Sequence, residues 1–246
     1  MIFEVLLAAV AIVAGGIAAV AGFGIGSLLT PTLAIATDTK LAVAAISIPH
    51  LIGTALRFWM LRRHVDRRVL WSFGITSALG GLLGALVHAN ASSRALSVVF
   101  GVLLLIAGVS ELSGLIERVR WGRRAAWVAG AVSGAFGGMV GNQGGIRTAA
   151  MLGFDVPKEA FVATATAIAL FVDAARLPVY LATQWRDIIA IWPLLLIASG
   201  GVVVGTVLGR RALGRLPQRT FRRAVAVLLV ILGLYMVLDQ LAPWRA

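Results

Sequence analysis

Eight long apolar segments are the feature that most constrains how this chain can fold, because segments of that length need a bilayer or a very large core around them. Their approximate bounds are 4–36, 41–61, 69–88, 94–113, 125–153, 159–182, 187–209 and 221–241. About 20 apolar residues are enough for a helix to cross a membrane. Since 60% of the residues are hydrophobic and 13% are charged, the sequence predicts an all-α integral membrane protein.

Two of the eight segments are interrupted by residues that destabilise helices. The first contains GFGIGSLLTP at 22–31, and the fifth contains GNQGG at 141–145. Inside a helix, glycine costs roughly 1 kcal/mol and proline about 3 kcal/mol relative to alanine. Non-helical backbone at membrane depth is tolerated where it lines a cavity or is covered by protein. We therefore expect each segment to form a broken, re-entrant helical hairpin, whose second half-helix begins at about Ser27 or Ile146.

The chain also repeats itself. A shift of 119 residues aligns Gly15 with Gly134, Gly22 with Gly141, Gly26 with Gly145, Leu33 with Leu152 and Arg57 with Arg176. After two extra residues near Thr183, a shift of 121 aligns Asp66 with Asp187, Trp71 with Trp192, Gly80 with Gly201 and Gly84 with Gly205. We predict two repeats of four segments each, residues 1–118 and 119–246, each of which opens with one of the hairpins.

The arginines predict how these segments are oriented. They concentrate in the connections 62–68, 117–124 and 210–223. If all eight segments crossed the membrane, 210–223 would lie opposite the other two, against the preference of basic connections for the cytoplasm. If both hairpins return to the side from which they enter, all three connections lie inside. The repeats are then inverted relative to each other, a recurrent plan of transporters with the binding site near the midplane.

The hairpin tips supply the candidate binding residues. The free N–H groups and the positive dipole at a helix N-terminus favour an anion, and the two tips approach each other from opposite faces. Arg147 and the amides of Asn142 and Gln143 add hydrogen-bond donors, although their bonding within the tip is an equal alternative. The predicted substrate-binding residues are Gly22, Gly24, Gly26, Ser27, Asn142, Gln143, Gly144, Gly145 and Arg147.

Ionisable residues inside the apolar segments are further candidates, because such groups in a membrane usually have a function. Asp173 and Arg176 lie three residues apart on one helical face, which favours a structural ion pair and leaves proton coupling open. His50 is either a neutral hydrogen-bonded side chain or a proton carrier. We interpret Arg57, near the end of its segment, as an anchor at the membrane interface.

The two tips carry a resemblance to a known family. GFGIGSLLTPTL at 22–33 and GNQGGIRTAAML at 141–152 resemble the paired glycine-rich signatures of the TauE/SafE sulfite exporter family. The resemblance implies a transporter in the bacterial inner membrane. It also implies export of sulfite or of organosulfur anions such as sulfonates and sulfoacetate, driven by the proton motive force.

Other functions have little support in the sequence. Absent cysteine and only three scattered histidines argue against a metal site, and no cofactor is expected. GFGIG lacks the βαβ context of a dinucleotide-binding site. No GxSxG motif is present, which argues against a serine hydrolase. The net charge is +12, but most basic residues lie between the apolar runs, which argues against nucleic-acid binding. The expected partners are a small sulfur-containing anion, protons and lipid, with a homodimer left open. A passive anion channel and, with less support, a membrane enzyme remain the alternatives.

Overall fold

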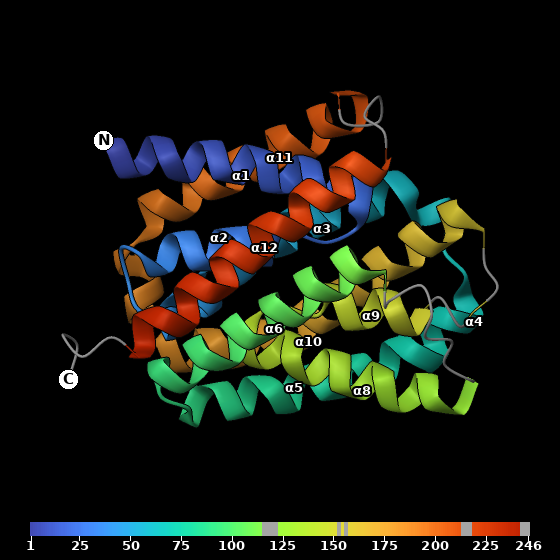
Figure 1. Ribbon diagram of the computed structural model, residues 1–246. Helices are drawn as coiled ribbons and strands as arrows, with labels where there is room; N and C mark the ends of the chain where they lie inside the picture. The colour runs from blue at the N-terminus through green and yellow to red at the C-terminus, as the bar shows by residue number, and fades with distance from the viewer. Residues whose placement is uncertain (115–122, 152–153, 155–156, 213–217, 242–246) are drawn as a thin grey trace.

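The computed structural model describes residues 1–114, 123–151, 154, 157–212 and 218–241 (Figure 1), and in these ranges the regular structure is entirely helical. The α-helices are α1 (Ile2–Ala21), α2 (Ile25–Ala34), α3 (Thr39–Leu61), α4 (Arg67–Val69), α5 (Ile75–Asn90), α6 (Ser93–Ser113), α8 (Arg123–Val140), α9 (Gly144–Met151), α10 (Lys158–Ala190), α11 (Trp192–Ala212) and α12 (Gln218–Leu241). A 3₁₀ turn, η1 (Arg62–His64), and a π turn, η2 (Leu70–Gly74), flank α4.

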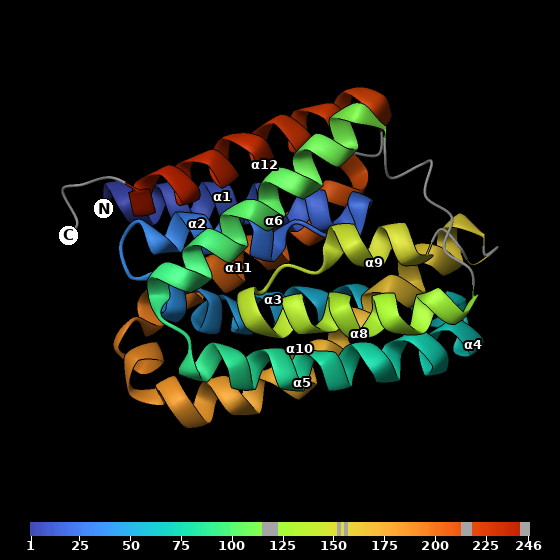
Figure 2. The same ribbon diagram turned by 60° about the horizontal axis from the view of Figure 1, so that its bottom comes forward.

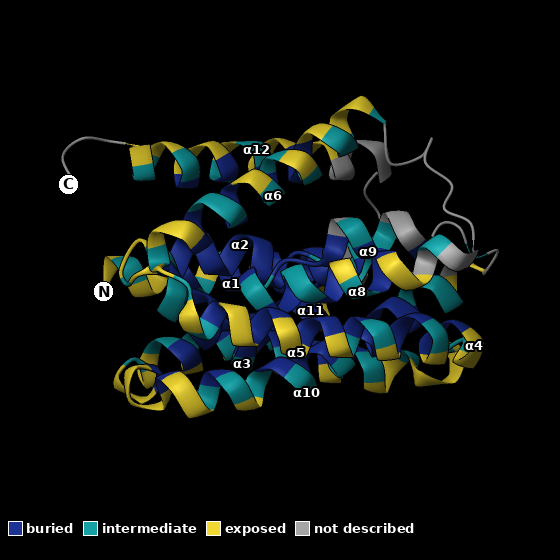
Figure 3. Cartoon of the chain, turned by 90° about the horizontal axis from the view of Figure 1, so that it is seen from below, coloured by how far each residue is buried: buried dark blue, intermediate teal, exposed yellow. Residues whose placement is uncertain are grey.

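Among the described residues, seven helical stretches are long and apolar enough to cross a membrane, which confirms the predicted all-helical class. They include α1, although the sequence placed it within a hairpin, whereas α2 and the apolar part of α8 are shorter. Large apolar side chains cover the outward faces: Leu83, Val128 and Leu196 are each more than 60% exposed. Buried residues gather along the middle of the bundle (Figure 3). Outer faces of this kind match the hydrocarbon of a bilayer.

The two short helices each fold back along a longer neighbour. In Figure 1, α1 starts at the end of the molecule that holds the N-terminus, and α2 returns toward that end. The α8–α9 pair starts at the opposite end and returns there. The opposite end also holds η1, α4 and the ends of α11 and α12 that flank residues 213–217. Two antiparallel helix pairs therefore enter the bundle from opposite ends.

The other helices pack in matching pairs. α1 lies on α11 and α5 lies on α8, while α3 and α10 contact each other in the middle (Figure 2). α6 and α12 pack together along one side. Backbones approach closely in two of these pairs: a Cβ on Gly205 would overlap the carbonyl of Ile12, and a Cβ on Gly84 would overlap that of Ala135. Small residues permit such close contact between membrane helices.

Some predicted boundaries are wrong. The sequence predicted a break between the segments 159–182 and 187–209, but this stretch is helical, because α10 continues to Ala190 across a kink at Gln184 (φ −135°, ψ 19°). At the kink, the buried side chain of Gln184 has a partner on α5, since its Nε2 atom lies 3.1 Å from His88 Nε2. Pro31, treated as a helix breaker, lies inside α2. The boundary between the predicted repeats, at 118–119, lies outside the described residues.

Candidate functional site

Two glycine turns face each other inside the bundle. The first tip, residues 22–24, joins α1 to α2, and the second tip, residues 141–143, joins α8 to α9. Gly22, Gly24 and Gly141 have φ values of 79°, 129° and 74°, a backbone region that side chains disfavour. The chain therefore needs glycine at these three positions to reverse direction. The half-helices begin at Ile25 and Gly144, two residues before the expected Ser27 and Ile146.

The two tips contact each other directly. Ser27 Oγ donates to Asn142 Oδ1 over 3.4 Å, a long hydrogen bond between the two halves of the chain. Arg147 Nη2 donates to the carbonyl oxygen of Gly22 over 3.2 Å. The two backbones also approach closely at Gly26, where an added Cβ would lie 2.5 Å from the carbonyl oxygen of Gly141. The structure thus brings residues predicted at the first tip together with residues predicted at the second.

Arg147 is the most unusual residue of this junction. Its side chain is 3% exposed, and its Nε and Nη1 atoms have no hydrogen-bond partner within the described residues. The side-chain oxygen of Gln143, also buried, has no partner in the described ranges, while its main-chain oxygen accepts from Ser133 Oγ. Gly144 packs against Phe23 of the first tip, and Gly145 lies in α9. A buried guanidinium with free N–H groups can bind an oxyanion through two oxygens.

A charged cluster lies beside the tips, between α3 and α10. Arg176 donates to Asp173 Oδ1 from Nε at 3.0 Å and from Nη2 at 2.8 Å, which confirms the expected ion pair. The second oxygen of Asp173 lies 2.7 Å from His50 Nδ1. All three side chains are buried. The contact with His50 joins two candidates that the sequence had treated separately.

This cluster also binds main-chain carbonyls at the end of α8, directly before the second tip. Arg176 Nη1 donates to the oxygen of Gly137 over 2.7 Å, and Tyr180 donates its hydroxyl to the oxygen of Gly138. His88 Nδ1 lies 2.8 Å from the oxygen of Met139. Three successive carbonyls at the end of α8 are therefore held by α10 and α5. Sequence reasoning did not single out Tyr180 or His88, and for His88 the available signal was an ionisable residue inside an apolar segment.

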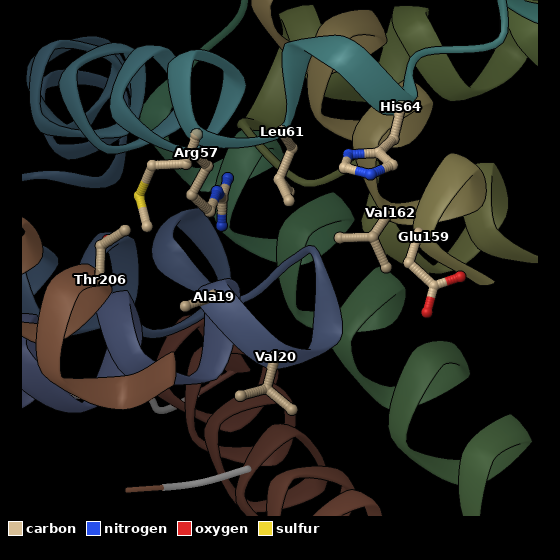
Figure 4. Close-up of a pocket in the computed structure, with 9 residues that line it drawn as sticks. Ala19, Val20, Arg57, Leu61, His64, Glu159, Val162 and Thr206 are labelled. Carbon is tan, nitrogen blue, oxygen red and sulfur yellow. The ribbon is translucent and has the colours of Figure 1, made fainter. Parts of the chain in front are cut away.

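Arg57 contradicts its interpretation as an interface anchor. It is 3% exposed, and its Nη2 atom donates to Thr54 Oγ1 over 3.2 Å. Thr54 in turn lies 3.4 Å from His50 Nδ1. Arg57 lines a cavity of about 220 Å³, and the lining also includes the exposed residues His64 and Glu159 (Figure 4). His64 belongs to η1, so the cavity lies toward that end of the molecule. The sequence feature that could have indicated this burial is the alignment of Arg57 with Arg176 in the repeat.

No cluster of three or more potential metal ligands occurs among the residues that the structure describes. What the geometry offers is a buried, positively charged junction suited to an anion. The model of one family, described as "Sulfite exporter TauE/SafE", matches residues 7–236. No curated protein and no solved structure matches the chain. The matched range covers nearly the whole sequence and includes both tips, the charged cluster and Arg57. The chain therefore belongs to the TauE/SafE family of membrane sulfite exporters.

Proposed function

We propose that this protein is a secondary transporter that exports sulfite or a related organosulfur anion, and that the anion binds where the two tips meet. The observation that carries the proposal is Arg147, a buried guanidinium whose Nε and Nη1 atoms have no acceptor in the part of the chain that the structure describes. An uncompensated charge in a low-dielectric interior is costly, and a bound anion removes that cost. The N-termini of α2 and α9 point their free N–H groups and dipoles toward the same junction.

We also propose that the two halves are inverted repeats and that the α1–α2 and α8–α9 pairs are re-entrant hairpins. The helix pairing supports this, because α1 packs on α11 as α8 packs on α5, and these partners correspond in the repeat. Aligned glycines make the close contacts in both places: Gly84 lies against α8, and Gly205 lies against α1. Such an arrangement lets one half rock against the other around a midplane site.

The proposed topology predicts that both termini face the outside and that the arginine-rich connections face the cytoplasm. A reporter fused after Ala246 should be active outside the cell, whereas one inserted within 210–223 should report the cytoplasm. The physical reason is the preference of clustered arginines for the cytoplasmic side. A cytoplasmic C-terminus would contradict the hairpin topology.

We place proton coupling at the pair of His50 and Asp173. His50 contacts Asp173, and Asp173 is linked through Arg176 to the end of α8, next to the second tip. On the other side, Thr54 connects His50 to Arg57. A proton on this pair would change the charge next to both arginines, so that proton and anion occupancy depend on each other. The coupled groups act as one titrating unit.

Replacing His50→Ala should make transport independent of the pH gradient while anion binding is largely kept. Initial rates of sulfite efflux, measured with and without an imposed gradient, test this. Ser47→Ala is the matched control, because Ser47 is buried one turn earlier on α3 and bonds to Ala44 of its own helix. Normal gradient dependence in a well-folded His50→Ala protein would rule out the coupling role.

The function itself is tested with purified protein in liposomes loaded with sulfite, methanesulfonate, sulfate or acetate. Saturable efflux of sulfite or methanesulfonate that accelerates with a pH gradient supports the proposal. A flux that ignores the gradient would instead indicate the passive channel. Chemical conversion of the substrate by detergent-purified protein would indicate the enzyme.

A further inference from the structure

Two arginines that correspond in the repeat have opposite electrostatic surroundings. The shift of 119 residues aligns Arg57 with Arg176, and it also aligns Thr54 with Asp173. Arg176 is neutralised by the carboxylate of Asp173. Arg57 has the hydroxyl of Thr54 in the corresponding place, and this hydroxyl accepts one hydrogen bond but carries no charge. The same helical position therefore yields an internal ion pair on α10 and, on α3, a cation that has no counter-charge among the described residues.

The cavity next to Arg57 contains unsatisfied polar atoms from two helices. Nε and Nη1 of Arg57 and Oγ1 of Thr206, on α11, have no hydrogen-bond partner among the described residues. Both side chains are buried, and both line the cavity of about 220 Å³. Figure 4 shows Arg57 directed between Leu61 and Ala19, with Thr206 on the neighbouring helix. These donors lie together in a space large enough for a small oxyanion.

Glu159 does not supply the missing counter-charge. It lines the same cavity, but its side chain is exposed, and the described residues show no ion pair between it and Arg57. Of the described charged residues near Arg57, Arg147 repels it, and Asp173 already pairs with Arg176. Arg57 and Arg147 are thus two buried cations within electrostatic reach of each other. An anion between them would be attracted by both.

We infer that Arg57 is a second binding residue for the transported anion, and that the exchange of Asp for Thr between the repeats is what frees it for this role. The inference rests on the proposed function and names a different residue, cavity and helix. Arg57 and Thr206 hold the oxyanion head of sulfite or of a short sulfonate at the end of the molecule that holds η1. The anion then passes from Arg57 toward Arg147 at the tips. Apolar walls formed by Val20, Met60 and Val162 accept the hydrocarbon part of a sulfonate.

The decisive variant gives Arg57 the counter-ion that Arg176 already has. In Thr54→Asp, the new carboxylate should pair with Arg57, because the aligned pair on α10 has this spacing. The melting temperature of the anion-free protein should therefore rise, while the affinity for sulfite and methanesulfonate should fall at least tenfold. Misfolding would lower both the melting temperature and the affinity. A higher melting temperature together with a lower affinity therefore distinguishes the new ion pair from misfolding. Thr54→Asn adds similar bulk without charge, and the difference between the two variants reports the charge alone.

The measurements use the detergent-purified full chain in gluconate buffer, with melting curves and calorimetric titration of sulfite, methanesulfonate and acetate. Arg57→Gln should also weaken binding at least tenfold, and it decides the question if Thr54→Asp does not fold. Parental affinity in folded Arg57→Gln protein would overturn the inference. The proposed function fails separately if the parent protein binds acetate but neither sulfite nor methanesulfonate. In that case, the effect of Arg57→Gln on acetate binding still tests whether Arg57 binds the anion.

Discussion

Arg147→Ala should weaken the binding of sulfite by about ten- to a hundredfold. Each hydrogen bond to a charged group contributes roughly 1.5–3 kcal/mol, and about 1.4 kcal/mol corresponds to a factor of ten in affinity. Two nitrogen atoms of Arg147 have no partner among the described residues at the junction of the tips, so the variant should remove at least one such bond to the anion. Arg147→Lys should restore part of the affinity, because lysine keeps the charge but lacks the planar fork that binds two oxygens. Calorimetric titration of purified protein measures both.

Arg94 provides the control for that experiment. It is exposed, and its Nη2 atom donates to the main-chain oxygen of Gln240. Its replacement by alanine removes the same charge far from the tips and should leave binding nearly unchanged. If Arg147→Ala folds and binds sulfite and sulfonates as tightly as the parent, then the junction is not the anion site. The tip glycines would in that case serve helix packing alone.

Asp173→Asn should lower the free energy of unfolding by about 3–5 kcal/mol, the usual cost of removing one partner from a buried ion pair. Asp173 is 0% exposed and contacts both Arg176 and His50, so the amide leaves the guanidinium buried without its counter-charge. Reversible denaturation in mixed detergent micelles measures the loss.

The double variant Asp173→Asn with Arg176→Gln separates charge from shape. Because the double variant leaves no unpaired charge at positions 173 and 176, it should be more stable than Asp173→Asn alone. A double variant that is less stable by the sum of the two single losses would show that the pair acts through its hydrogen bonds and not through its charges.

The tips illustrate what a single sequence reveals. The glycine clusters predicted both turns, because positive φ values and close approach require glycine there. Their exact ends were missed by two residues, since a helix starts where its first hydrogen bonds form and glycine does not mark that point. The Asp173–Arg176 pair was predictable because it is local, three residues apart on one helix.

The long-range contacts were not predictable in this way. His50 reaches Asp173 only because α3 packs on α10, and no periodicity within either helix contains that information. Arg57 was misjudged for the same reason: its place near the end of an apolar run resembles that of an interface anchor, but neighbouring helices bury it. The alignment of Arg57 with Arg176 could have indicated this burial, because a repeat places equivalent residues at equivalent depth in the membrane.

The basic end of the molecule has a kinetic consequence. Four exposed arginines, Arg62, Arg63, Arg67 and Arg68, lie beside His64 near the mouth of the Arg57 cavity. Clustered charge of one sign creates a surface potential that can raise the local concentration of an oppositely charged solute about tenfold or more. At the other end, the surface cavity contains Asp38 and Asp239. We therefore expect anions to concentrate more at the face where the Arg57 cavity opens than at the opposite face. Salt screens this attraction over about 10 Å at 0.1 M, so we expect a higher ionic strength to slow anion binding from that side of the membrane more than from the other.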